Sequence, residues 1–288
     1  MEDLDRRLLL GAAGIAGVAA FAGRSSAGPL NPPAGAVGST GRTLDEVYNK
    51  IAPPGGADGR TPIPGGSSPY TITQGGSYVL TGSITLPSGG NAIIINVPAG
   101  ADVAIDLNGF SINGSTDTSQ GIIGTGNVPA SITIRNGTFN GHVNAILVGN
   151  GTLLFEDLVF TRARWKAISI LGTGGCHAVV RRCMIVRTGE ATASNDNIDV
   201  RAIEFTGCSG VVEDCVIDLV THANPARAKV GIYQSGGTAI VIRRNAVNAA
   251  GIGIRTDSSA TIVYRDNTVT ATFNAYSTTG ATNGGGNV

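Results

Sequence analysis

Charged residues are scarce in this sequence, and the two signs balance. Only 14% of the 288 residues are Asp, Glu, Lys or Arg, against roughly 25% in an average soluble domain. Twenty basic and twenty acidic residues give a formal net charge of zero. A neutral chain has no overall field that would attract nucleic acid or an anionic membrane. We therefore expect no nucleic-acid partner, and a site for a charged ligand must be a local patch.

The apolar run near the N-terminus is short for a membrane span. It covers Leu8–Ala22, which is 15 residues, whereas a membrane helix needs about 20. The run follows Arg6 and Arg7 and is rich in Gly and Ala, which is typical of a twin-arginine export signal. We expect residues 1–27 to be such a signal and the protein to be periplasmic, extracellular or at the cell surface, without a membrane span after processing. An uncleaved membrane anchor is the alternative.

Glycine and proline, in contrast, are abundant, and they delimit the domain. The chain has 43 Gly and 12 Pro, which favour frequent turns and short strands over long helices. We interpret residues 28–69 as a Pro/Gly-rich stalk and residues 276–288 as a Gly/Asn-rich tail. Within the stalk, apolar residues recur at helical spacing behind a threonine N-cap, which predicts a short helix over 43–51. Residues 70–275 remain for a single domain.

A small residue followed by isoleucine recurs along this domain. The pairs are 20 to 35 residues apart, and each is followed by a turn and a second apolar stretch. They are Ala92-Ile93, Gly121-Ile122, Ala145-Ile146, Ala167-Ile168, Ala202-Ile203, Gly231-Ile232 and Gly251-Ile252. Repeats of this length bury their apolar faces only by stacking on neighbours, and no helical pattern suited to a βαβ crossover lies between them. The pattern predicts an all-β solenoid, a parallel β-helix of about eight coils.

A charged dipeptide in the second apolar stretch of each repeat gives an independent register. Its charge runs +1, −2, +2, −2, +2 and 0 along the chain. The dipeptides are Arg135-Asn136, Glu156-Asp157, Arg181-Arg182, Glu213-Asp214, Arg243-Arg244 and Arg265-Asp266. Equivalent residues of neighbouring coils lie about 4.8 Å apart, where unlike charges attract. Each exposed contact contributes only about 0.2–1 kcal/mol, so we interpret this ladder as scaffold that fixes the register and not as a binding patch.

Four cysteines follow the same repeat. Cys176 and Cys208 are 32 residues apart, as are Cys183 and Cys215, so each pair falls on equivalent positions of neighbouring coils. Stacked cysteines lie within the Cα distance that a disulfide spans, and they also pack well as thiols. Zinc binding is a third alternative, with His177 beside Cys176, but Cys-x6-Cys is not a zinc-finger spacing. We expect no metal at these cysteines, and both disulfide and thiol stay open.

Several phrases of the sequence resemble known proteins with this kind of repeat. They are TLDEVYNKI (43–51), PYTITQGGSYVLTGSI (69–84), AIDLNGFSING (104–114), SITIRNGTF (131–139) and VVEDC (211–215). The repeat resembles the right-handed parallel β-helix of the pectate-lyase-like superfamily, and the phrases resemble a broad group of exported bacterial β-helix repeat proteins. The resemblance covers roughly residues 43–270 and implies the fold and export. It supplies no catalytic residue.

Two long insertions enter the repeat just before an Ala/Gly-Ile pair. They cover residues 188–201 and 221–229, and the preceding coil contributes 161–166 at the same place. Equivalent positions of consecutive coils lie on one edge of a solenoid, so we expect the three segments to lie side by side. Loops on a rigid scaffold often carry function, and we place the candidate site at this edge.

The residues of this edge suit binding or acid–base chemistry. Trp165 offers an aromatic face to a sugar ring, and the cations suit the carboxylates of an acidic polysaccharide. The candidates for binding are Arg164, Trp165, Lys166, Arg227 and Lys229. The candidates for catalysis are Asp196, Asp199, Arg201 and His222, and the two aspartates also suit Ca²⁺. The phrase NDNID (195–199) resembles the NTDGxD of polygalacturonase-type hydrolases, although their GHG and RIK phrases are absent.

Three functions stay open on the sequence. The first is binding of a polysaccharide or cell-envelope glycan without catalysis, and the second is a lyase or hydrolase acting on an acidic glycan. The third is a purely structural surface protein. The fold does not decide among them, and the sequence gives no oligomeric state.

Overall fold

The computed structural model describes residues 59–67, 69–87, 89–114, 119–125, 129–193, 196–237, 239–257, 261–278 and 281–288. All of them belong to one compact unit, Lys50–Val288. The expected export signal (1–27), most of the expected stalk and the expected helix (43–51) lie outside the described residues. None of the described residues forms a helix long and apolar enough to span a membrane.

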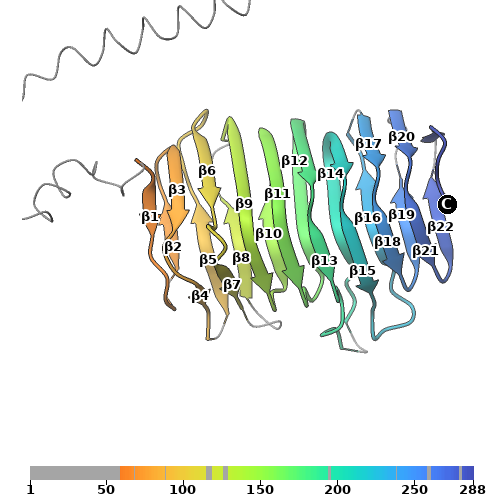
Figure 1. The fold of residues 1–288 in the computed structure, drawn as a ribbon, viewed down its shortest axis with the longest axis horizontal. Coiled ribbons are helices and arrows are strands. Elements are labelled where there is room, and N and C mark those ends of the chain that lie inside the picture. Colours follow the sequence, from red (N-terminus) through yellow and green to blue (C-terminus); the bar gives the residue numbers. More distant parts are fainter. Residues whose placement is uncertain are drawn as a thin grey trace, which may run out of the picture. The chain divides into compact units, whose positions relative to one another are not determined.

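The strands stack in three parallel columns, which we call faces A, B and C (Figure 1). Face A comprises β2 (Tyr70–Ile72), β5 (Gly90–Ile95), β8 (Ser119–Gly124), β10 (Asn144–Val148), the first parts of β12 (Lys166–Arg181) and β14 (Val200–Glu213), β16 (Lys229–Ser235), β19 (Ile252–Thr256) and β22 (Asn274–Thr278). The chain passes from face A to face B, then to face C, and returns to face A one coil further on. This is the parallel β-helix that the repeat predicts.

The other two faces are built in the same way. Face B comprises β1 (Thr61–Ile63), β3 (Gly76–Leu80), β6 (Asp102–Asp106), the first parts of β9 (Ser131–Asn140) and β11 (Thr152–Thr161), the second parts of β12 and β14, β17 (Ala239–Arg243), β20 (Thr261–Arg265) and β23 (Ala281–Asn283). Face C comprises β4 (Ile84–Thr85), β7 (Ser111–Asn113), the second parts of β9 and β11, β13 (Met184–Val186), β15 (Val216–Val220), β18 (Ala246–Ala249) and β21 (Thr268–Ala271).

The strands extend beyond residues 70–275 at both ends. β1 pairs with β3 although its residues fall in the expected stalk, and β23 pairs with β20 although its residues fall in the expected tail. Val288 continues the pairing, since its amide donates to the carbonyl of Asn267 at 2.9 Å. The tail residues described here therefore belong to the last coil.

The small-residue–Ile pairs mark equivalent positions on face A, with one correction. Ile122, Ile146, Ile168, Ile203 and Ile232 follow one another in register and are fully buried. In the next coil, however, Ile232 pairs with Ile254, so the last mark is Gly253-Ile254 and not Gly251-Ile252. A Cβ on Gly253 would lie 2.0 Å from Cγ1 of Val269. The inward position next to the isoleucine therefore requires a glycine there.

The charge ladder has the predicted register at the corner between faces B and C. Glu156 pairs in register with Arg135 and Arg181, and Glu213 pairs with Arg181 and Arg243. Arg181 and Arg243 reach back to the glutamate of the preceding coil, each at 2.6 Å. The alternating charges thus form ion pairs between coils, as expected for scaffold.

The column that follows this ladder is deeply buried. It contains Leu158, Cys183, Cys215, Asn245 and Asn267, each at most 2% exposed. The two asparagines form a hydrogen-bonded ladder in which the Asn245 amide donates to Oδ1 of Asn267 at 3.1 Å, and Nδ2 of Asn267 donates to the carbonyl of Ile242 at 3.0 Å. These side chains supply partners for backbone groups that lie inside the solenoid.

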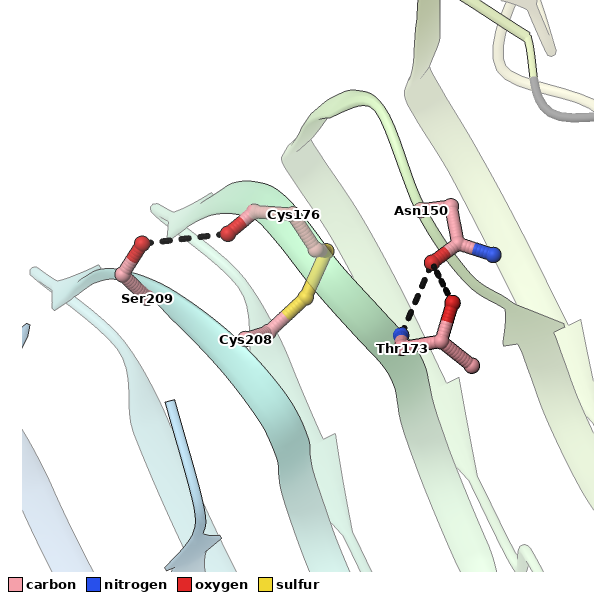
Figure 2. The surroundings of a disulfide bond; sticks show 5 residues. All are labelled: Asn150, Thr173, Cys176, Cys208 and Ser209. Atoms are coloured by element: carbon pink, nitrogen blue, oxygen red, sulfur yellow. Dashed lines mark hydrogen bonds between the residues drawn. A yellow bond between two sulfur atoms is a disulfide. The ribbon is translucent and has the colours of Figure 1, made fainter. Parts of the chain in front are cut away.

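One cysteine pair is a disulfide and the other is not. Cys176 and Cys208 are joined across β12 and β14 with a Cα–Cα distance of 4.8 Å (Figure 2). Gly172 leaves the space for this bond, because a Cβ there would lie 2.9 Å from Sγ of Cys208. Cys183 and Cys215 are buried thiols, and hydrogen bonding to Cys215 together with burial raises the pKa of Cys183. Two of the four cysteines considered for the zinc alternative are therefore bonded to each other.

A buried histidine lies at the corner between faces C and A. His142 is 1% exposed, with Nε2 3.0 Å from the carbonyl of Ile112 and Nδ1 3.4 Å from the hydroxyl of Ser119. Because a carbonyl only accepts, the neutral ring carries its proton on Nε2. Burial lowers the pKa of His142 to about 4, and the hydrogen bond to Ile112 opposes this shift in part.

Candidate functional site

The three predicted segments do lie side by side. We call the predicted segments 161–166, 188–201 and 221–229, together with Arg187 directly before the second of them, the loop edge; it connects face C to face A in three consecutive coils (Figure 1). The amide of Gly189 donates to the carbonyl of Ala163 at 2.7 Å, and the amide of Thr221 donates to that of Thr188 at 2.9 Å. Each segment is therefore hydrogen-bonded to the one before it, and the edge is one continuous surface.

Asp196 is held by an arginine of the preceding coil. Its two carboxylate oxygens accept from Nε and Nη2 of Arg164 at 3.1 and 2.9 Å, and Oδ2 also accepts from the amide of Ala193. The Arg164 guanidinium lowers the pKa of Asp196 against a smaller raising effect of burial. A carboxylate that is ionised and paired in this way is poorly suited to act as a general acid.

Asp199 and Arg201 belong to a second group of charges, centred on Glu204. Arg201 donates to Asp199 through Nη2 at 3.3 Å and to Glu204 through Nη1. Nζ of Lys166 lies 2.5 Å from Oε2 of Glu204, which also accepts from the Ser169 hydroxyl at 2.7 Å. Burial alone raises the pKa of Glu204, but Lys166, Ser169 and Arg201 outweigh it and the pKa is lowered.

Glu204 and Tyr233 complete this cluster on the outer side of face A, and neither was predicted. The guanidinium of Arg201 lies 3.8 Å from the ring centroid of Tyr233, a cation–π contact. Arg255 of the next coil lies 5.7 Å from the same ring and is paired with Asp257 at 2.7 Å. One signal was available in the sequence: Glu204 is a charged residue between Ile203 and Phe205, two apolar residues that are buried in β14.

The second insertion is fixed to the first by its polar side chains. Nε2 of His222 donates to the carbonyl of Ile198 at 2.9 Å, and Nδ1 accepts from the amide of Asn224 at 2.8 Å. Arg227 donates to the side-chain oxygen of Asn197 at 3.0 Å, and Lys229 donates to the carbonyl of Pro225 at 3.0 Å. Both ring nitrogens of His222 are thus occupied by backbone groups, as expected for a structural histidine.

Trp165 lies at the centre of the edge and is only half-exposed. The guanidinium of Arg164 lies 5.7 Å from its ring centroid, and the Trp165 backbone carbonyl accepts from the amide of Arg201 at 2.9 Å. Its remaining surface is therefore smaller than that of the freely exposed aromatic platform that the sequence predicts.

The loop edge carries an excess of positive charge in a chain that is neutral overall. It contains seven Lys and Arg residues and three Asp and Glu residues. Among the described residues, no carboxylate oxygen lies within 4 Å of the side-chain nitrogens of Arg187, Arg227 or Lys229. Arg227 and Lys229 donate to neutral oxygens instead. These three charges remain without an anionic partner in the part of the chain that the structure describes.

The carboxylates of the edge do not form a metal site by themselves. Within the described ranges, no group of three or more His, Cys, Asp or Glu side chains is placed to hold a metal ion. Asp196 and Asp199 are directed to different cations, Arg164 and Arg201. The geometry thus gives no support to Ca²⁺ binding as an alternative use of these aspartates.

Comparison with known proteins agrees with the fold. The family model described as "right handed beta helix region" matches residues 109–287, which is more than half of the chain. Neither the curated proteins nor the solved structures give a significant match. The stacked parallel strands, the three faces and this match together lead to one conclusion: the chain belongs to the right-handed β-helix family.

Proposed function

We propose that this protein is an exported β-helix protein that binds a polysaccharide or cell-envelope glycan, without catalysis, through the loop edge. The observation that carries this proposal is the uncompensated charge of Arg187, Arg227 and Lys229. Cations that no folding contact neutralises are suited to the carboxylate or other anionic groups of an acidic glycan. A regular scaffold with two hydrogen-bonded insertions supports binding, since the surface needs little reorganisation to engage a ligand.

The engagement of the candidate catalytic groups favours binding over a lyase or hydrolase. Asp196 is paired with Arg164, and His222 uses both ring nitrogens within the loops. A general acid or base needs a proton-transfer atom within hydrogen-bond reach of the substrate, and these atoms are occupied within the loops. Asp199 accepts from Arg201 and from the amide of Ala228 at 3.1 Å, so it is committed as well.

A glycan array with matched variants tests the binding proposal. The double variant Arg227→Gln, Lys229→Gln removes two uncompensated charges, and we expect it to bind at least about tenfold more weakly, since two rim contacts of about 0.7 kcal/mol each give one decade. Trp165→Ala should weaken binding further. The control is Arg265→Gln, which removes an exposed arginine from face B, outside the loop edge, and should bind like wild type.

Three outcomes would contradict parts of the proposal. If wild type binds no glycan, the hypothesis of a purely structural surface protein replaces the binding proposal. If uronate polymers yield reducing ends or unsaturated products, and Asp199→Asn abolishes this, the protein is an enzyme. Export is tested separately by replacing Arg6 and Arg7 with lysine: we expect the precursor to stay inside the cell, and unchanged export would refute the twin-arginine assignment.

A further inference from the structure

Arginines occupy left-handed backbone positions at two different corners of the solenoid. At the corner between faces B and C, Arg182 and Arg244 have φ values of 52° and 55°. Each is held by two carboxylates of the preceding coil: Arg182 by Asp157 at 2.7 Å and Glu156 at 2.9 Å. Arg244 contacts Asp214 and Glu213 at 2.7 and 3.0 Å. Folding contacts account for arginine at both positions.

The corner between faces C and A has the same left-handed backbone conformation but lacks these ion pairs. Gly141, Arg162 and Arg187 are equivalent in three consecutive coils, with φ values of 70°, 58° and 59°. Each donates its amide at 3.0 Å to a carbonyl of the next coil, namely that of Thr161, Val186 and Asp218. This column leads directly into the loop edge.

The two arginines of this second corner have no comparable partner. Arg162 is 56% exposed, and its nearest carboxylate is Glu190 at 3.9 Å, itself 51% exposed. Arg187 is exposed, and no described carboxylate lies within 4 Å of it. A non-glycine residue in the left-handed region costs free energy, and the preceding coil avoids this cost with Gly141. The following coil has Leu219 at the equivalent position, with a φ value of 55°, so the left-handed backbone also accepts an uncharged side chain. The charge of the two arginines lacks the ion pairs that account for arginine at the first corner.

We propose that Arg162 and Arg187 form a paired recognition element for a polyanionic glycan, one that carries an anionic group on successive units of its chain. The inference rests on the proposed function, because it names the ligand class of the same edge. The two backbones lie one coil apart, about 4.8 Å, so a polymer with closely repeated charges contacts both side chains. A neutral glycan offers no anionic partner to either of them.

The matched arginine pairs of the two corners provide the experiment. We compare Arg162→Asn, Arg187→Asn with Arg182→Asn, Arg244→Asn, since asparagine tolerates the left-handed conformation and carries no charge. Binding is measured to neutral dextran, carboxymethyl dextran and dextran sulfate, which share one backbone, and stability is measured by thermal unfolding of the full chain.

The expected results separate recognition from scaffold. Wild type should bind the charged dextrans and not the neutral one, and Arg162→Asn, Arg187→Asn should bind at least tenfold more weakly with an unchanged or higher Tm. The pair Arg182→Asn, Arg244→Asn should retain binding and lose at least about 2 °C in Tm, as expected when ion pairs are removed from a domain of this size. A preference between the two charged polymers then assigns carboxylate or sulfate.

Several results would overturn this inference, and they differ from those that overturn the proposed function. A Tm loss in Arg162→Asn, Arg187→Asn as large as in the other pair would show a structural role. Equal binding to neutral and charged dextran, or undiminished binding by the variant, would remove the arginine pair and leave glycan binding in place. If wild type binds no charged dextran, the polyanion is excluded, and the glycan array alone decides the proposed function.

Discussion

Acid should destabilise this protein through one buried histidine, well above the pH at which its carboxylates are protonated. His142 is 1% exposed, and burial lowers its pKa in the folded protein from 6.5 to about 4. The unfolded chain binds a proton at this residue near pH 6.5, whereas the folded chain does so only near pH 4. Stability is therefore complete above pH 6.5 and is lost as the pH falls toward 4.

The magnitude follows from the two pKa values. The lowering of the His142 pKa from 6.5 to about 4 corresponds to about 3.4 kcal/mol of unfolding free energy in total. About 2 kcal/mol of this is lost between pH 7.5 and pH 5.0. Asp106, Asp157, Asp196, Glu204 and Asp214 also have shifted pKa values in the folded state. Theirs are lowered, so their contribution is largely kept at pH 5.0 and is lost as the pH falls below their ordinary pKa values of 3.8 for Asp and 4.5 for Glu. The chosen window thus isolates the histidine.

Urea unfolding of wild type and His142→Gln at the two pH values is the assay. Glutamine keeps a donor for the carbonyl of Ile112 but does not titrate, so the variant should lose about 2 kcal/mol less than wild type between pH 7.5 and pH 5.0. His177→Gln, on the exposed outer side of β12, should retain the wild-type loss. Equal losses in wild type and His142→Gln would refute the reasoning. So would an NMR titration in which His142 of the folded protein protonates near pH 6.5, a measurement that needs no variant.

Three further predictions concern the interior of the solenoid: its disulfide, its buried thiols and its asparagine ladder. Removing the disulfide with Cys176→Ser, Cys208→Ser should cost about 3–4 kcal/mol of unfolding free energy, because it opens a closed loop of 32 residues. In the untreated protein, a thiol reagent should modify Cys183 and Cys215 only after unfolding. Fast labelling of the native state would contradict their burial. Asn267→Leu should cost at least about 2 kcal/mol, since it leaves the Asn245 amide and the Ile242 carbonyl without partners, whereas Asn248→Leu on the exposed side of face C should change stability by about 0.5 kcal/mol or less.

The register could be predicted from the sequence because two independent patterns agree on it. The spacing of the isoleucines and the alternation of charge between Glu156, Arg181 and Glu213 admit one alignment of the coils. The prediction was wrong only where the sequence is degenerate. GIGI at residues 251–254 offers two Gly-Ile pairs, and the interior selects the second because Gly253 faces Val269.

The contacts within the loop edge could not be predicted in the same way. Its position follows from the coil length, but the pairing of Arg164 with Asp196 depends on the path of a 14-residue insertion that has no periodicity. Glu204 illustrates the difficulty further. It lies on the outer side of face A, yet it is buried because Lys166 and Arg201 come from two coils to cover it. A pattern within one coil does not contain that information.

The energetics of the coils explain why insertions are tolerated at this edge. The coil between Ala145 and Ala167 has 22 residues, and the next, up to Ala202, has 35. Closing the longer loop costs only about 0.4 kcal/mol more in chain entropy. The disulfide between Cys176 and Cys208 joins the longer coil to the coil that follows it and contributes about 3–4 kcal/mol. Loop length at this edge is therefore limited little by stability, and the residues that the insertions carry can be selected for what they contact outside the solenoid.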